Sequence, residues 1–189
     1  MSMACARISA WIISTSMTLK SISVSLLCSL LLWADGCAGP VGGGLRMTDP
    51  VLQPHEDAAE LEQLVRQAHD RVNAHRASLG VTQLRLDARI SRVARRHSAR
   101  MAQGAAFSHQ GFKQRATAIG RFMPYRTVAE NLAYNYGNAD PAARAFNSWL
   151  NSPKHRQAME DLHFTHTGLA VAKSPSGRFY FTQLFVLPR

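Results

Sequence analysis

The C-terminal end of the chain, residues 165–187, constrains the fold more than any other segment. Two runs rich in β-branched and aromatic residues, 165–173 and 178–187, flank the sequence Ser-Pro-Ser-Gly. This pattern predicts two strands joined as a hairpin. The apolar residues before the hairpin recur mainly with helical spacing. The sequence therefore predicts an α+β fold in which helices pack on a small antiparallel sheet.

Helix start and stop signals divide the region before the hairpin. A first helix is expected from Pro54 to Gly80, a C-cap candidate, and a second from its N-cap Asp87 to about Gln103. Their predicted inner faces are Leu61, Leu64, Val65, Ala68 and Val72 in the first helix and Ile90, Val93, Ala94, His97 and Met101 in the second.

Asp140-Pro141 and Ser152-Pro153 repeat one helix-start signal, in which proline takes the first helical position. The two helices are expected to end at Leu150 and at about Glu160. The residues that the first of them should bury are Phe146, Trp149 and Leu150. Both helices therefore lie directly before the predicted hairpin.

Local sequence patterns predict the structure of three other stretches. Residues 81–86 form an extended stretch that should put Leu84 and Leu86 on one side. Residues 107–120 form a loop that leads into a short helix. Residues 130–137 fit either a strand or a final helical turn, because periodicity alone does not decide between them.

Residues 1–37 resemble an export signal, with Met17 as a possible true start. Lys20 precedes an apolar core at 22–33, too short for a spanning helix, which needs about 20 residues. The sequence Ala-Asp-Gly-Cys is similar to the lipobox of bacterial lipoproteins, so Cys37 is a candidate for lipidation and membrane anchoring. Asp35 is unusual there, and ordinary cleavage near Cys37 is the alternative.

The expected domain plan is therefore an export signal, a Gly/Pro-rich linker at 38–54 and one folded domain at 55–189. The cysteines are Cys5, Cys28 and Cys37, so the folded domain can form no internal disulfide and contains no catalytic thiol. The expected location is the cell envelope, with the domain membrane-anchored, periplasmic or extracellular.

The chain is strongly basic, with a net charge of +10 and 22 Lys and Arg residues. The densest basic feature is the stripe Arg85, Arg89, Arg92, Arg96 and Arg100. One reading is a solvated helix face, and the other is contact with an anionic component of the envelope. Nucleic acid is disfavoured as a partner, because no aromatic residues interleave with the arginines and the leader implies export.

Several segments resemble, in order, the bacterial branch of the CAP superfamily (cysteine-rich secretory, antigen 5 and pathogenesis-related proteins; the SCP domain). They include "FSH", "AENLAY" and "SWLNSPKHR", and the similarity runs from about residue 61 to 187. The resemblance implies a three-layer α-β-α sandwich with a central cavity lined by histidine and glutamate. Carried over by motif, the cavity residues are His109, Glu130 and His155, with Ser152 where many members have a second acid.

Three roles remain open for this implied set. His109, Glu130 and His155 could bind a divalent metal such as zinc and so activate water. A histidine and the glutamate could also act as general base and acid without metal. The cluster could equally be a hydrogen-bonded network that only joins helices and sheet. Ser152 in place of an acid argues against mechanisms that need paired carboxylates.

Other polar residues are expected to be structural rather than functional. They are Asn73, Arg76, His97, Asn131 and Trp149. His163 and His166 form an H-x-x-H pair at a loop-to-strand junction, where a metal site is less expected than on a helix face.

The sequence favours an exported envelope binding module for a lipid, glycan or protein, and binding over catalysis. A metal-assisted hydrolase of peptides or cell-wall material is the alternative, and a structural or stress-related envelope protein is a second one.

Overall fold

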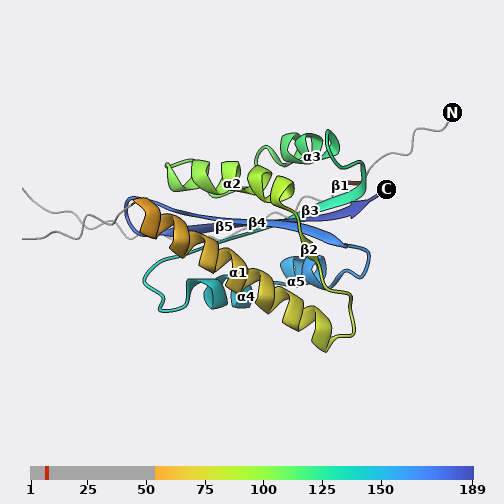
Figure 1. Ribbon diagram of the computed structural model, residues 1–189, viewed down its shortest axis with the longest axis horizontal. Helices are drawn as coiled ribbons and strands as arrows, with labels where there is room; N and C mark the ends of the chain where they lie inside the picture. Colours follow the sequence, from red (N-terminus) through yellow and green to blue (C-terminus); the bar gives the residue numbers. More distant parts are fainter. Residues whose placement is uncertain (1–6, 9–53) are drawn as a thin grey trace, which may run out of the picture. The chain divides into compact units, whose positions relative to one another are not determined.

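The computed structural model describes residues 7–8 and 54–189 (Figure 1). The candidate lipidation site Cys37, the apolar core of the expected leader and the linker up to residue 53 lie outside the described residues. None of the helices within the described part of the chain has the length and apolar character that crossing a membrane requires.

The elements follow the predicted order, with helices before a terminal hairpin. The helices are α1 (Pro54–Ser78), α2 (Ala88–Ala102), α3 (Phe112–Gly120), α4 (Pro141–Leu150) and α5 (Pro153–Glu160). The strands are β1 (Arg7–Ile8), β2 (Arg85–Leu86), β3 (Tyr125–Asn135), β4 (His166–Lys173) and β5 (Phe179–Pro188). Residues 130–135 are thus part of a strand and not of a helical turn, and β1 falls inside the range expected for the leader.

The sheet has the strand order β1-β3-β5-β4-β2. The antiparallel β4–β5 pair is the predicted hairpin, and β3 pairs antiparallel with the other side of β5. The short strands β1 and β2 run parallel to β3 and β4. Strand β5 is therefore central, and β3 carries residues of the candidate site toward one side of the sheet.

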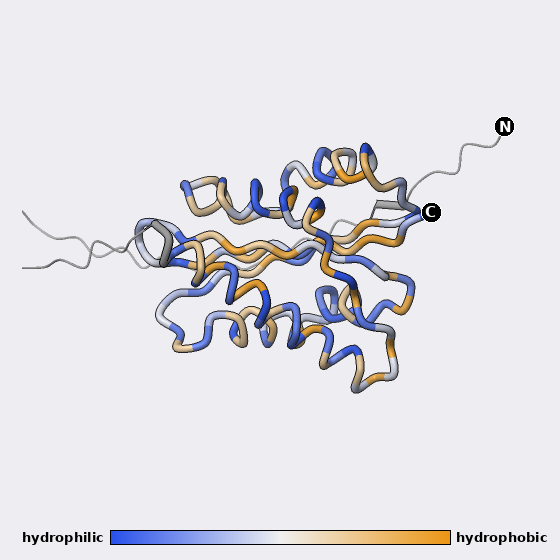
Figure 2. The backbone as a smooth tube through the Cα atoms, in the orientation of Figure 1, coloured by the Kyte–Doolittle hydropathy of each residue, from blue (hydrophilic) through white to orange (hydrophobic). Residues whose placement is uncertain are grey.

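Helices cover both faces of the sheet, which confirms the α-β-α sandwich. Helices α2 and α3 lie on one face, and α1, α4 and α5 lie on the other (Figure 1). Apolar residues follow the strands between the two helical layers, whereas many residues on the helices are hydrophilic (Figure 2). Trp149 of α4 is fully buried and meets the Phe181 ring of β5 edge-on, with the centroids 6.5 Å apart. Each helical layer therefore has its own core against the sheet.

Most of the predicted helix ends are confirmed. Asp87 accepts hydrogen bonds from the backbone of Arg89 and Ile90, and Asp140 accepts one from Ala143. Gly80 ends α1 with a φ of 69°, a conformation that glycine adopts without strain. Two further details concern the start of α5 and the stretch at 81–86.

Helix α5 begins as predicted, with Ser152 at the N-cap position and Pro153 in the first turn, although the Ser152 side chain makes no capping hydrogen bond. In the stretch at 81–86, Leu84 is buried and Leu86 is 40% exposed. Leu86 is the last residue of the two-residue edge strand β2 and lies next to Asp87, the N-cap of α2.

Helix α2 approaches the sheet closely at Gly168 of β4. A Cβ atom at Gly168 would lie 2.4 Å from the backbone carbon of Ile90, so only glycine fits there. Ser98 of the same helix donates to Thr182 Oγ1 over 2.8 Å. This contact fixes α2 on β4 and β5, and with it the position of His97.

Candidate functional site

Glu130 is the most constrained acid of the described domain. It lies on β3 and is 1% exposed, facing Arg115 of α3, which is 5% exposed. Arg115 Nε donates to Glu130 Oε2 over 2.5 Å, and Arg115 Nη2 donates to Oε1 over 2.6 Å. The two residues therefore form a buried bidentate ion pair, which is the strongest geometry for arginine and a carboxylate.

The sequence reasoning did not single out Arg115. It lies on the same face of α3 as Phe112, Ala116 and Ile119, which are all buried. A cation on an otherwise apolar helix face needs a buried anion or carbonyl as partner. That pattern is the signal that could have identified Arg115.

His109 completes the set of contacts to the carboxylate. Its Nδ1 atom lies 2.8 Å from Glu130 Oε1, so Nδ1 carries the proton and donates a hydrogen bond to the carboxylate. Burial alone would raise the pKa of Glu130. The hydrogen bonds from His109 and Arg115 and the charge of Arg115 outweigh burial and lower that pKa below its ordinary value. Glu130 therefore remains ionised at neutral pH.

His155 of α5 is the second histidine of the implied set and is 3% exposed. Its backbone carbonyl accepts a hydrogen bond from Asn131 Nδ2 over 3.0 Å, which ties α5 to β3. Burial, and after it the charge of His109, lowers the pKa of His155 to about 4. His155 is therefore neutral at pH 7, with one ring nitrogen free to act as a ligand or acceptor.

Three imidazole nitrogens of His109 and His155 are buried without a hydrogen-bond partner among the described residues. They are His109 Nε2, His155 Nδ1 and His155 Nε2. Buried polar atoms are nearly always paired, so each of these atoms needs an explanation. We refer to His109 and His155 together as the two-histidine site.

Metal binding by His109, Glu130 and His155 together stays a prediction. Among residues 7–8 and 54–189, no three His, Cys, Asp or Glu side chains are placed to hold one metal ion. Arg115 and His109 occupy both oxygens of Glu130. Glu130 accepts the hydrogen bond from His109 Nδ1, an arrangement common behind metal-bound histidine, so Nε2 is the atom of His109 that could ligate a metal. Ser152 makes no side-chain hydrogen bond with any described residue.

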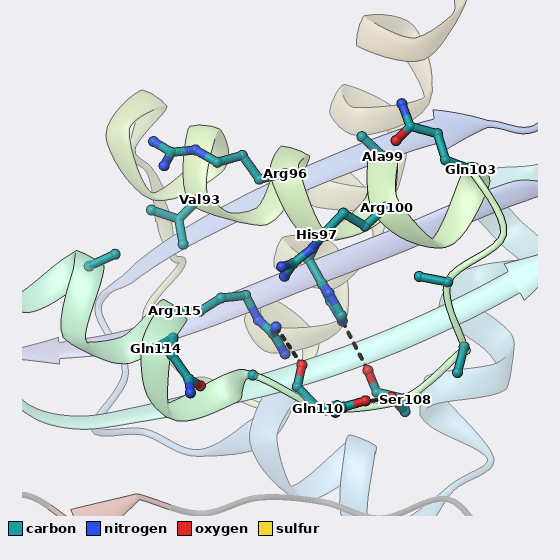
Figure 3. Close-up of a pocket in the computed structure, with 14 residues that line it drawn as sticks. Val93, Arg96, His97, Ala99, Arg100, Gln103, Ser108, Gln110, Gln114 and Arg115 are labelled. Atoms are coloured by element: carbon teal, nitrogen blue, oxygen red, sulfur yellow. Dashed lines mark hydrogen bonds between the residues drawn. The ribbon is translucent and has the colours of Figure 1, made fainter.

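A hollow of about 820 Å³ opens beside this site, between α2, α3 and the loop that joins them (Figure 3). Arg115 and His97 line it, whereas His109, Glu130 and His155 do not. The hollow is therefore not the cavity that the resemblance implied. Arg115 separates the two, since it lines the hollow and also binds Glu130.

Comparisons with known proteins decide the family. A profile of the cysteine-rich secretory protein (CAP) family matches residues 69–185, which is more than half of the chain. The chain belongs to the CAP family. The match includes His109, Glu130 and His155, and it extends from the middle of α1 into β5.

Relatives of this CAP domain occur in longer proteins. The chain is 34% identical over 125 residues to an uncharacterized membrane protein of Bacillus subtilis, YlbC, and the match covers 64% of this chain and 34% of YlbC. A second B. subtilis protein, YkwD, is 30% identical over 117 residues, 60% of this chain and 43% of YkwD. The chain thus spans less than half of these relatives.

Solved structures share the same fold. An extracellular protein of Bacillus anthracis with an SCP domain has a TM-score of 0.61 at 25% identity, covering 71% of this chain and 44% of that one. An outer surface protein of Borrelia burgdorferi has a TM-score of 0.60 at 20% identity, covering 68% and 95%. The second likeness concerns the fold alone.

The remaining polar residues of the CAP domain mostly join elements. Asn73 exchanges two hydrogen bonds with the backbone of Leu84. Arg76 is fully buried, and Trp149 Nε1 donates to Leu132 O over 3.0 Å. The acceptors of the Arg76 guanidinium are the backbone carbonyls of Thr82, Met159, Asp161 and Phe164.

His97 and the H-x-x-H pair have separate surroundings. His97 Nε2 lies 3.0 Å from Ser108 O, and burial, followed by the charge of Arg115, lowers the pKa of His97 to about 4. His163 is exposed and bonds Asp161, whereas His166 bonds Thr165. His163 and His166 therefore have different partners.

The arginine stripe does not form one uniform surface. Arg89 pairs with Asp87 and lies over the Phe122 ring, 5.1 Å from its centroid. Arg96 and Arg100 line the hollow, whereas Arg92 lines a different groove. The stripe is therefore divided among several environments.

Proposed function

We propose that this protein is a binding module of the cell envelope whose ligand site is the two-histidine site, and not a hydrolase. The observation that carries the proposal is the state of Glu130. Its carboxylate is saturated by Arg115 and His109, while three imidazole nitrogens beside it have no partner. Unpaired imidazole nitrogens favour a bound ligand, whereas Glu130 has no oxygen free to act as a base.

Hydrolysis with Glu130 as the general base would require that its carboxylate can accept a proton during the reaction. An efficient general base has a pKa near the working pH and a free position toward the substrate. Glu130 has a lowered pKa and both oxygens occupied. The second acid of many CAP proteins is Ser152 here. Neither residue supports a hydrolytic role.

The candidate occupant of the site is a divalent metal such as zinc. Neutral imidazole is a preferred zinc ligand, and both His155 and the Nε2 atom of His109 fit that requirement. Zinc bound by two protein ligands would keep open positions, where a group of an envelope ligand could coordinate. Glu130 would act by holding the His109 ring in place.

Two observations support a location in the cell envelope: the export-type leader and the descriptions of two related proteins. One relative at 34% identity is described as a membrane protein, and one at 25% identity as extracellular. We propose export, with Cys37 as the candidate lipid anchor. A membrane fraction labelled by a fatty-acid probe in the wild type and not in Cys37→Ser tests the anchor.

Zinc calorimetry on the purified protein tests the two-histidine site. We expect stoichiometric binding that is lost in His109→Ala and in His155→Ala. Glu130→Gln should weaken it by about 10–100-fold, the usual effect of changing a group that orients a ligand. The matched control is His163→Ala/His166→Ala, which removes two histidines outside the site. Equal loss in this control, or no saturable binding in the wild type, would contradict the proposal.

A further inference from the structure

The hollow between α2 and α3 has a chemistry of its own. Its polar rim carries Arg96 and Arg100 of α2, both exposed and both without a side-chain partner among the described residues (Figure 3). Arg115 also lines it, but its charge is balanced by Glu130. No acidic residue lines the hollow. Two positive charges therefore remain uncompensated at its rim.

The N-terminus of α3 faces the same space. Gly111 is the N-cap, with a φ of 79° and no side-chain cap, and the backbone N–H groups of Lys113 and Gln114 have no acceptor among the described residues. Arg100 Nη2 lies 4.0 Å from the position of a Cβ atom at Gly111. A guanidinium from α2 and the positive end of α3 thus converge, which is a favourable setting for an anion.

A third, independent feature is the His97 ring, which is 4% exposed and lines the hollow. Its Nε2 atom bonds Ser108 O, while Nδ1 is buried without a partner. Because Nε2 faces a carbonyl, it carries the proton and Nδ1 is a hydrogen-bond acceptor. The low pKa of His97, about 4, keeps it in that neutral form. A donor such as a hydroxyl group would satisfy Nδ1.

We propose that this hollow binds a hydroxyl-bearing phosphate ester. The phosphate lies between Arg96, Arg100 and the N-terminus of α3, and a hydroxyl of the ester donates to His97 Nδ1. The apolar wall takes the carbon part of the ligand, and its residues are Val93, Ala99, Ala105, Ala106 and Ala118. Free glycerol phosphates and glycerol-phosphate lipid head groups share this chemistry. The site is separate from the two-histidine site and does not depend on it.

Calorimetry with sn-glycerol 3-phosphate on the purified protein tests the site, and a parallel arm measures sedimentation with phosphatidylcholine vesicles that contain phosphatidylglycerol. Arg96→Gln/Arg100→Gln should weaken binding by about tenfold or more, because charge-assisted hydrogen bonds to phosphate are lost. The matched control is Arg92→Gln/Arg95→Gln, which removes the same charge from the same helix outside the hollow. It should change affinity by less than about twofold.

Loss in Arg96→Gln/Arg100→Gln alone supports the site, and the arm that shows the loss identifies a free ester or a lipid head group. Equal weakening by both double variants would mean that only the net charge matters and would refute the site, as would no saturable binding in either arm. Propyl phosphate, which lacks the hydroxyl, should bind more weakly than glycerol phosphate. Equal affinity would refute the role of His97. Zinc binding should be unchanged in both double variants, which separates this test from that of the two-histidine site.

Discussion

Replacing Arg115 by methionine tests the buried ion pair that organises the candidate site. The substitution keeps much of the side-chain volume but removes both hydrogen bonds to Glu130 and those to the carbonyls of His109 and Gln110. Removing one partner of a buried pair leaves an uncompensated charge, and this costs about 3–5 kcal/mol. That is a large part of the ~5–15 kcal/mol that stabilises a typical domain.

The pH dependence of this loss follows from the pKa of Glu130. In the wild type that pKa is lowered, so its stabilisation is present above the unfolded value of 4.5 and is lost as pH falls through the folded value. Without Arg115 the pKa of Glu130 should rise, because burial raises it and two of the causes that lower it are lost. The variant is then destabilised most at neutral pH, and less as pH falls and the acid becomes neutral.

Urea unfolding followed by far-UV circular dichroism at pH 7 and at about pH 4.5 measures both effects. Arg115→Met should lose about 3–5 kcal/mol at pH 7 and clearly less at the lower pH. The double variant Arg115→Met/Glu130→Met should recover most of the loss, because no buried charge is left unpaired. Lys113→Met, an exposed change on the same helix, should stay within about 0.5 kcal/mol of wild type. A loss below about 1 kcal/mol at pH 7, or no recovery in the double variant, would refute the reasoning.

Two further substitutions test how the helices are fixed on the sheet. Gly168→Ala would place a Cβ atom 2.4 Å from the backbone of Ile90 and should lower the free energy of unfolding by about 3 kcal/mol or more. Thermal unfolding measures this loss, and a melting temperature within about 2 °C of wild type would contradict the close packing. Arg76→Met should cost a similar amount, because four backbone carbonyls lose their buried donor, whereas Arg66→Met on the exposed side of α1 should cost about 0.5 kcal/mol or less.

Much of the fold could be predicted because its signals are local. Asp87 and Asp140 cap their own helices, and the hairpin has its turn between two β-rich runs. The exposure of Leu86 could not be predicted, because it depends on where a two-residue edge strand stops pairing with β4. Local pattern gives the faces of an element, whereas its neighbours decide which face is covered.

The site was predictable only in part. Motif similarity named His109, Glu130 and His155, and the structure brings Glu130 and His109 into direct contact. Motif similarity did not show that Arg115 binds both oxygens of the Glu130 carboxylate, because the two residues are 15 positions apart and no short motif contains both. That one contact changes Glu130 from a candidate base or ligand into a fixed anion.

Arg115 contributes to both proposed sites, so an Arg115 variant cannot distinguish one from the other. It forms part of the wall of the hollow, and through Glu130 it holds His109, so any change at Arg115 disturbs both places. Its hydrogen bonds to the carbonyls of His109 and Gln110 fix the loop between α2 and α3, whose residues line the hollow. A loss of phosphate-ester binding in an Arg115 variant would therefore not localise that ligand. Arg96 and Arg100 make no hydrogen bond or ion pair with Glu130 or His109, so substitutions of that pair report on the hollow alone.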